Sequence, residues 1–237
     1  MTYRDKKLAH TIYLYLGVLF ITSLVVSNLI FQKFFYWMPF GEDTMVFGAP
    51  LFVVSVGILP YPITFLITDL ISEIYGAKKA NQIVTAGIFA SFFSMGIVYL
   101  AEVAPAVETS PVSDDIFHKV FALSPVAVLA SMIAYLFAQY VDIAIYHFWK
   151  RLTKGKMLWL RNNFSTFSSQ FIDTFTVVSL LCVFQVIPWS MFYGLVVSGV
   201  IFKILIAFID TPFLYFFVHI FRKRFKLEIG QEIDLEV

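Results

Sequence analysis

Long apolar windows alternate along the chain with short polar segments. The windows cover residues 11–31, 59–75, 83–103, 121–149, 167–187 and 190–221. An α-helix needs about 20 residues to cross the hydrocarbon core of a bilayer, and each window is close to this length or longer. The pattern therefore predicts an all-α polytopic membrane protein with six transmembrane helices.

The apolar stretch at residues 45–59 complicates the second span, because it ends in Pro60-Tyr61-Pro62. Proline removes a backbone donor and ends or kinks a helix. We expect the second helix to be broken near Pro60 and Pro62. Residues 45–59 then form either a half-helix or part of the second span, and a seventh complete crossing is the competing interpretation.

The distribution of Lys and Arg decides between six crossings and seven. The N-terminus, the loops after the second and fourth spans and the C-terminus together hold 14 of the 17 basic residues. Basic loops remain in the cytoplasm, so six spans with both termini inside fit this alternation, and a seventh would break it. We expect a single transporter domain over residues 1–237, with short cytoplasmic tails at 1–10 and 222–237.

Composition supports a membrane protein and narrows its chemistry. Hydrophobic residues make up 59% of the chain, charged residues 14%, and the mean hydropathy is +0.82. The basic residues form no single stripe, so no nucleic-acid partner is expected. Neither an HExxH motif nor a phosphate-binding loop of the GxxxxGKS or GxGxxG type occurs, and Cys182 is the only cysteine. We therefore expect no catalytic site, metal or cofactor, and an intramembrane enzyme is the weaker alternative.

Acidic side chains inside the predicted spans are the main functional signal. Five of the 16 lie there: Asp69, Glu73, Asp142, Asp173 and Asp210. A carboxylate that faces lipid at a helix centre costs about 2.5 to 3.5 kcal/mol, so these groups should face one another, water or a ligand. Counting the helical rise places the four aspartates in one layer, roughly 12 to 18 Å from the cytoplasmic helix ends.

The spans contain one basic residue, Lys203, two helical turns from Asp210 and on the same face. It can neutralise one carboxylate. The remaining carboxyl groups inside the spans must then be protonated or must neutralise a cation that binds and is released. Either arrangement is typical of a transporter. We interpret Asp69, Glu73, Lys203 and Asp210 as proton-linked or structural polar residues.

The phrase Gln-x-x-Asp occurs twice in the predicted spans, as Gln139 with Asp142 and as Gln170 with Asp173. This spacing puts the amide and the carboxylate on one helix face. Two such stripes on neighbouring helices could hold the polar edges of a planar, purine-like ring, although the same atoms would also serve an amine or a chain of protons. We expect these residues to bind the substrate, with Phe175 against the ring face.

Asn28, at the outer end of the first span, is a further candidate for substrate binding.

Three stretches carry a resemblance to a known family. They are GILPYPITFLITDLISEIYGAKKA at 57–80, AYLFAQYVDIAIYHFWK at 134–150 and NNFSTFSSQFIDTFTVVSLL at 162–180. In this order they closely resemble the queuosine precursor transporter family, which is grouped with vitamin uptake transporters. The resemblance implies functional roles for Asp69, Glu73, Gln139, Asp142, Gln170 and Asp173.

The same resemblance implies a six-helix protein of the bacterial inner membrane that imports 7-deazaguanine precursors for queuosine modification of tRNA. The substrate would be 7-cyano-7-deazaguanine, 7-aminomethyl-7-deazaguanine or queuine. The alternative is a substrate-binding membrane subunit that needs an ATPase partner. The expected partners are the lipid bilayer and the small molecule, and a homo-oligomer is compatible with these features.

Overall fold

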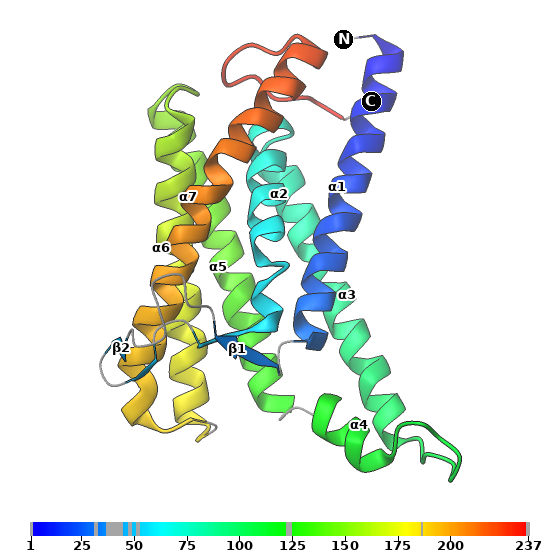
Figure 1. Cartoon of the computed structure of the whole chain (residues 1–237). Helices are drawn as coiled ribbons and strands as arrows, with labels where there is room; N and C mark the ends of the chain where they lie inside the picture. The colour runs from blue at the N-terminus through cyan, green and yellow to red at the C-terminus, as the bar shows by residue number, and fades with distance from the viewer. Residues whose placement is uncertain are drawn as a thin grey trace.

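The computed structural model describes residues 2–30, 33–36, 45–46, 49–50, 53–121, 125–185 and 187–235. Six α-helices of 14 to 34 residues stand side by side in these ranges as a bundle (Figure 1). They are α1 (Tyr3–Ile30), α2 (Tyr61–Ile74), α3 (Ala77–Val103), α5 (Pro125–Leu152), α6 (Leu158–Val183) and α7 (Phe192–Phe225). A short helix, α4 (Asp114–Phe121), and two 3-10 turns, η1 (Val56–Ile58) and η2 (Trp189–Met191), complete the helical elements of the described part.

Length and hydropathy identify five of the described segments as able to cross a membrane. They are Tyr3–Ile30, Val56–Ile74, Ala77–Val103, Leu158–Val183 and Trp189–Phe225. The prediction of a predominantly helical, multi-pass membrane protein is therefore confirmed.

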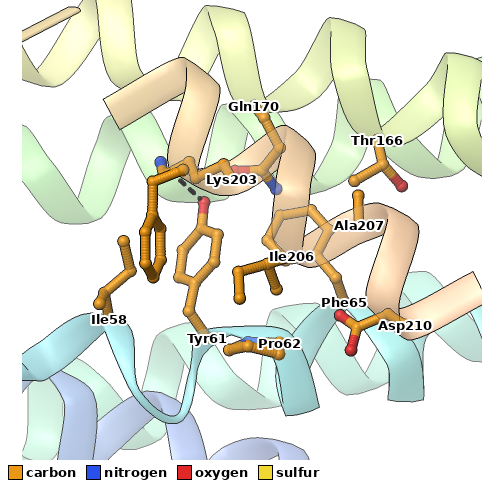
Figure 2. A pocket seen from close by; sticks show the side chains of 11 residues that line it. Ile58, Tyr61, Pro62, Phe65, Thr166, Gln170, Lys203, Ile206, Ala207 and Asp210 are labelled. Carbon is orange, nitrogen blue, oxygen red and sulfur yellow. Dashed lines mark hydrogen bonds between the residues drawn. The ribbon is translucent and has the colours of Figure 1, made fainter. Parts of the chain in front are cut away.

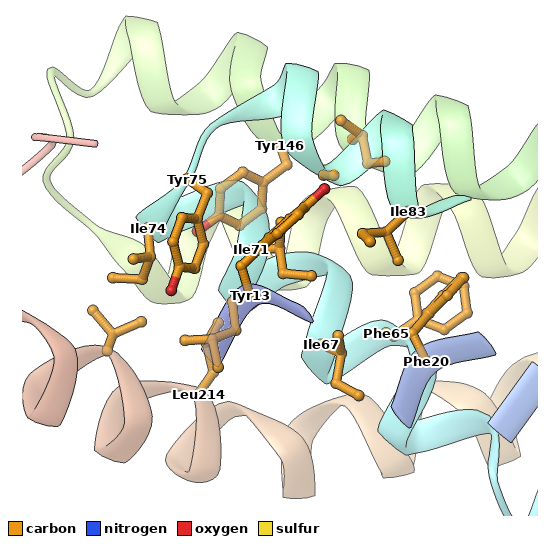
Figure 3. Close-up of a cluster of buried hydrophobic side chains, with 14 of the residues drawn as sticks. Tyr13, Phe20, Phe65, Ile67, Ile71, Ile74, Tyr75, Ile83, Tyr146 and Leu214 are labelled. Carbon is orange, nitrogen blue, oxygen red and sulfur yellow. The ribbon is translucent and has the colours of Figure 1, made fainter. Parts of the chain in front are cut away.

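Helix α2 lies at the centre of the bundle. Every residue from Thr64 to Ile74 except Leu66 is buried, including the polar ones, because α1, α3, α5 and α7 all pack against this helix. Figure 3 shows Ile67 and Ile71 of α2 within the main apolar cluster of the bundle. The polar residues of α2 therefore face other helices and not lipid.

The prolines before α2 start the helix and do not break it. Pro60 is its N-cap residue, and Pro62 lies in the first turn, where the missing N–H has no partner to lose. The expected interruption of the second span near Pro60 is present, as the change from the 3-10 turn that ends at Ile58 to the α-helix that begins at Tyr61. Because α2 is only 14 residues long, it crosses the bundle together with the 3-10 turn η1 (Val56–Ile58) that precedes it.

The described residues between Met45 and Leu59 form neither a half-helix nor an extension of α2. Strands β1 (Phe34–Tyr36) and β4 (Val53–Ser55) pair antiparallel, with Phe34 opposite Ser55, and β2 (Met45–Val46) pairs with β3 (Ala49–Pro50). Pairing satisfies their backbone groups without a helix. The half-helix interpretation is therefore wrong for the described residues, whereas Val56–Ile58 belong to the second span, as the other interpretation held.

Glycines allow two pairs of helices to approach closely. A Cβ at Gly17 of α1 would lie 2.5 Å from Ile83 of α3, and one at Gly87 of α3 would lie 2.8 Å from Phe20 of α1. Gly199 of α7 similarly faces Thr174 of α6. Small residues at such crossings let helices pack by dispersion contacts, which is the main attraction between helices in lipid.

Both chain termini lie at one end of the bundle, and β1, β2 and α4 lie at the other (Figure 1). The helices extend into the predicted tails, since α1 starts at Tyr3 and α7 continues to Phe225. After α7, residues 227–235 fold back over the end of the bundle; we call this segment the C-terminal strap. Its Ile233 is 3% exposed and donates its N–H to the Ile74 carbonyl at 2.7 Å.

Two further contacts fix the strap. Glu232 forms an ion pair with Lys150 of α5 at 2.8 Å. Gly230 packs on Gly155 in the α5–α6 turn, and both adopt positive φ angles, near +84° and +75°. The strap is therefore docked on the bundle, in contrast to the free tail expected at residues 222–237.

Candidate functional site

A pocket opens between α2, α6 and α7, with η1 at one end (Figure 2). It encloses about 270 Å³ of space, its mouth included. The lining residues are Ile58, Tyr61, Pro62, Phe65, Thr166, Gln170, Phe202, Lys203, Ile206, Ala207 and Asp210. Aromatic and aliphatic walls with a few polar groups are typical of small-molecule sites.

Gln170 places its amide on the α6 wall of the pocket. The side chain is 1% exposed, and its Oε1 atom has no hydrogen-bond partner within the described part of the chain. A buried acceptor left unpaired costs about 1 to 3 kcal/mol, so it is a ready place for a donor from a ligand.

Lys203, Tyr61 and Asp173 form a connected group at the same wall, which we call the Tyr61–Asp173–Lys203 triad. The Lys203 Nζ forms an ion pair with Asp173 Oδ2, and the Tyr61 hydroxyl donates to the same oxygen at 2.8 Å. Nζ also lies 3.3 Å from the Tyr61 Oη and 4.6 Å from the centre of its ring. Lys203 therefore neutralises Asp173, across the α6–α7 contact, and not Asp210 on its own helix.

The Gln139–Asp142 stripe does not line the pocket. Gln139 donates its Nε2–H to the Tyr135 hydroxyl at 2.7 Å, and Asp142 accepts from Ser169 Oγ at 2.9 Å. Both side chains are fully buried on α5, which packs on α6, α3 and α2, whereas the pocket lies between α2, α6 and α7. Of the two stripes that were expected to form a clamp, only the one on α6 faces α2 and α7, the helices that bound the pocket with it.

Asp69, Asp142 and Asp210 come together from α2, α5 and α7, and we call them the acidic layer. Asp69 interacts electrostatically with the other two carboxyls. A second cavity of about 220 Å³ is lined by Phe65, Leu66, Asp69, Asn162, Thr166, Ala207, Asp210 and Leu214. It shares Phe65, Thr166, Ala207 and Asp210 with the first, so the two cavities adjoin.

Asp173 is not in the acidic layer, although the sequence placed four aspartates at one depth. Its partner Lys203 precedes Asp210 by seven residues on α7, which corresponds to about 10 Å along the helix. Asp173 therefore belongs to a level nearer the end that carries the strands. Counting residues from loop charges misses this offset because the helices extend unequally beyond the predicted spans.

Glu73 is the centre of a separate ion-pair network. Its Oε1 lies 2.5 Å from Arg161 Nη2 and 2.5 Å from Arg222 Nη2, while Lys150 Nζ lies 3.6 Å from Oε2. Tyr146 donates its hydroxyl to Oε2 at 2.9 Å. Arg161 and Lys150 are 0% and 6% exposed, so these two residues, which the sequence assigned to a basic loop, are internal counter-charges.

Asn28 and Phe175 are not among the residues that line the pocket. Asn28 is half-buried on α1, which packs on α2 and α3. Phe175 is 45% exposed on the outer face of α6, where its ring stacks on Phe171 with centroids 5.9 Å apart. The geometry therefore does not support the predicted role of either residue at the site.

Sequence reasoning predicted only Gln170, Lys203 and Asp210 among the lining residues, and those it missed include Tyr61, Thr166 and Phe202. Tyr61 carries a recognisable signal, since it stands between two prolines at the start of a span. Thr166 precedes Gln170 by four residues and so shares its helix face, a spacing that could have identified it. Phe202 is one of 28 phenylalanines, and nothing in the sequence distinguishes it.

Comparisons with known proteins agree with a membrane carrier. Residues 55–217, more than half of the chain, match the model of a family described as "Putative vitamin uptake transporter". A protein of Bacillus subtilis (strain 168) named "Probable queuosine precursor transporter" is 28% identical over 164 residues, which is 68% of this chain and 70% of that protein. No solved structure matches. Every residue that lines the two cavities falls inside the matched range.

Proposed function

Because the chain belongs to the vitamin uptake transporter family, we propose that it imports a 7-deazaguanine precursor of queuosine across the bacterial inner membrane. The name of the Bacillus subtilis relative supports this substrate class. The observation that carries the proposal is the unpaired Gln170 amide oxygen beside Lys203 in a pocket with aromatic walls.

The chemistry of the pocket suits a planar lactam with an adjacent amino group. The ring N–H donors would pair with Gln170 Oε1 and with Asp173 Oδ1, which also lacks a partner among the described residues. The ring carbonyl would accept from Lys203 Nζ. Tyr61, Phe65 or Phe202 would cover the faces of the ring, where stacking on an aromatic side chain contributes about 1 to 3 kcal/mol per base.

We further propose six crossings, formed by α1, η1 with α2, α3, α5, α6 and α7, with both termini in the cytoplasm. The support is the position of both termini at one end and the 14 basic residues in the segments that flank that end. Positive charge near helix ends favours the cytoplasmic side. The pocket would then lie between the two membrane surfaces, as alternating access requires.

Uptake of labelled 7-cyano-7-deazaguanine into cells that cannot synthesise it tests the pocket. Gln170→Leu removes the unpaired acceptor, and Lys203→Met removes the cation, so both variants should lose at least about tenfold in uptake if each contact contributes about 1.4 kcal/mol or more. Phe175→Leu is the matched control on the same helix and should keep wild-type uptake. Unchanged uptake in both pocket variants, at equal membrane abundance, would contradict this site.

Competition by the aminomethyl compound, queuine and guanine in the same assay would rank the substrates. Purified protein in liposomes separates a carrier from a binding subunit. A self-sufficient carrier moves substrate in the absence of any ATPase, whereas a subunit that depends on an ATPase binds substrate without moving it.

A further inference from the structure

The acidic layer differs from every other group of buried charges described here, because it lacks a cation. Glu73 is paired with Arg161 and Arg222, and Asp173 is paired with Lys203. No ion pair to Asp69, Asp142 or Asp210 occurs within the ranges that the structure describes. The cations inside the bundle are thus committed to other carboxylates.

The neighbours of the acidic layer on α2 and α6 supply no unpaired cation, and Lys203 of α7, which lines the first pocket with Asp210, is paired with Asp173. Helix α2 adds Glu73, which its own cations neutralise, and α6 contributes hydroxyl and amide groups. The α6 groups are Asn162, Ser165, Thr166 and Ser169. Asp69 and Asp142 are 3% and 0% exposed, and Asp69 Oδ1 and Asp142 Oδ2 have no partner in the described part of the chain. Asp210 is half-buried, and Asp69 meets the charge of both other carboxyls. Carboxylates gathered in this way without a paired cation favour uptake of a positive charge from outside.

From this arrangement we infer that the acidic layer binds a proton and releases it during each transport cycle, so that the proton gradient drives accumulation of substrate. The inference rests on the proposed import function and adds its energy source. It assigns coupling to Asp69, Asp142 and Asp210, and it leaves Glu73 and Lys203 as structural and substrate-facing groups.

An independent observation points to a small ligand at the same place. Thr166 is 5% exposed, its Oγ1 has no partner among the described residues, and it lies on the wall of both cavities. The second cavity therefore has an unsatisfied hydroxyl as well as carboxylates, which is the lining that a relay of protons or water needs.

Asp210 provides the link to the substrate, because it lines the substrate pocket and the second cavity together (Figure 2). A ligand in the pocket changes the surroundings of Asp210, and a proton on the acidic layer changes the charge that the ligand meets. Two sites that share one side chain in this way are coupled in both directions. Pro212, two residues further along α7, removes a backbone hydrogen bond near this point and so weakens the helix there.

Liposomes that contain the purified full-length protein test the inference with two measurements. The first is accumulation of labelled 7-cyano-7-deazaguanine under an imposed proton gradient, acidic outside. The second is counterflow, the exchange of external label for internal unlabelled substrate at equal pH on both sides. Wild type should show both, and a sodium gradient of the same size should give no accumulation.

Asp69→Asn and Asp142→Asn should reduce the proton-driven accumulation ratio at least tenfold while counterflow continues, because exchange needs no net proton movement. Retained counterflow also shows that each variant is folded and inserted. Asp114→Asn, at an exposed position on α4, is the control and should behave as wild type.

Three results would overturn the inference. Wild-type counterflow without any response to the proton gradient would leave the proposed function intact and refute the coupling. Accumulation driven by sodium would refute the proton as the coupled ion. Proton-driven accumulation that persists in both Asn variants would refute the residue assignment, whereas absence of counterflow in wild type would overturn the proposed import itself.

Discussion

Glu73 illustrates at the scale of one residue how a buried charge holds helices together. Its carboxylate joins Arg161 of α6, Arg222 of α7 and Lys150 of α5 around the end of α2. Lys150 also donates to the carbonyls of Ser72 and Glu73, at 3.3 and 3.0 Å, in the last turn of α2. Removal of this anion leaves the buried Arg161 and the partly exposed Arg222 without the carboxylate they pair with, while Lys150 keeps Glu232.

Glu73→Gln should therefore destabilise the protein by about 3 to 5 kcal/mol, the usual cost of breaking a buried ion pair on one side. Thermal unfolding in detergent would show a lower midpoint and membrane abundance would fall. Glu108→Gln, in an exposed loop, is the control and should unfold as wild type does. A Glu73→Gln variant with an unchanged midpoint would show that the network carries little of the stability.

Tyr61 supports the pocket through a single hydroxyl. Tyr61→Phe removes the hydrogen bond to Asp173 and keeps the ring, so the Lys203 ammonium loses one of the groups that orient it. A hydrogen bond to a charged group contributes about 1.5 to 3 kcal/mol, so the KM for uptake should rise roughly tenfold or more. Tyr193→Phe, 70% exposed on α7, serves as the matched control. An unchanged KM in Tyr61→Phe would mean that the triad does not position the ligand.

The sequence identified the acidic residues of the interior but not their partners. A carboxylate in lipid is costly whatever its neighbours are. The five acids inside the predicted spans could therefore be recognised from the sequence alone. Whether Lys203 reaches Asp173 or Asp210 depends on how α7 is rotated against α6. The hydropathy pattern does not predict that rotation. It also does not predict that the Arg161 side chain turns into the bundle.

Among the elements, the α5–α6 turn and the C-terminal strap depend on glycine. Gly155→Ala would place a Cβ 2.6 Å from the Gly230 Cα and would strain a backbone with φ of +75°. We expect a lower thermal midpoint and faster proteolysis of the strap. Gly96→Ala on α3, where a Cβ meets nothing within 4 Å, should leave the midpoint unchanged or raise it, because alanine favours the helix by roughly 0.5 to 1 kcal/mol. Equal behaviour of the two variants would contradict the close packing at Gly155.

The positions of the helices could be predicted from the sequence, and their ends could not. The six apolar windows each overlap one long helix of the structure, since the length of the hydrocarbon core selects them. Helix α6 nevertheless starts at Leu158, well before the predicted window, because Arg161, Asn162 and Asn163 are polar but buried. The short strands near residue 50 were missed because an apolar run of this length does not distinguish strand from helix.

At the scale of the whole molecule, the proposed topology predicts that the end with both termini faces the cytoplasm and that the end with α4 faces outward. Cys182 is the only cysteine and is 1% exposed, so a Cys182→Ala background is suitable for labelling. Val107→Cys, 70% exposed near α4, should react with an impermeant maleimide in intact cells. Ile229→Cys, 62% exposed on the strap, should react only after lysis. The reverse pattern would place the termini outside and would remove the support that the basic residues give to import.

The docked strap also affects how this protein can be handled in the laboratory. A purification handle or fluorescent reporter fused after Val237 would be separated by four residues from Ile233, whose side chain is enclosed by the bundle. Such a fusion would pull on the Glu232–Lys150 pair and disturb the quantity it was added to measure. Reporters of abundance are better inserted in the exposed segment around Val107, at the opposite end of the molecule, where no packed residue anchors the chain.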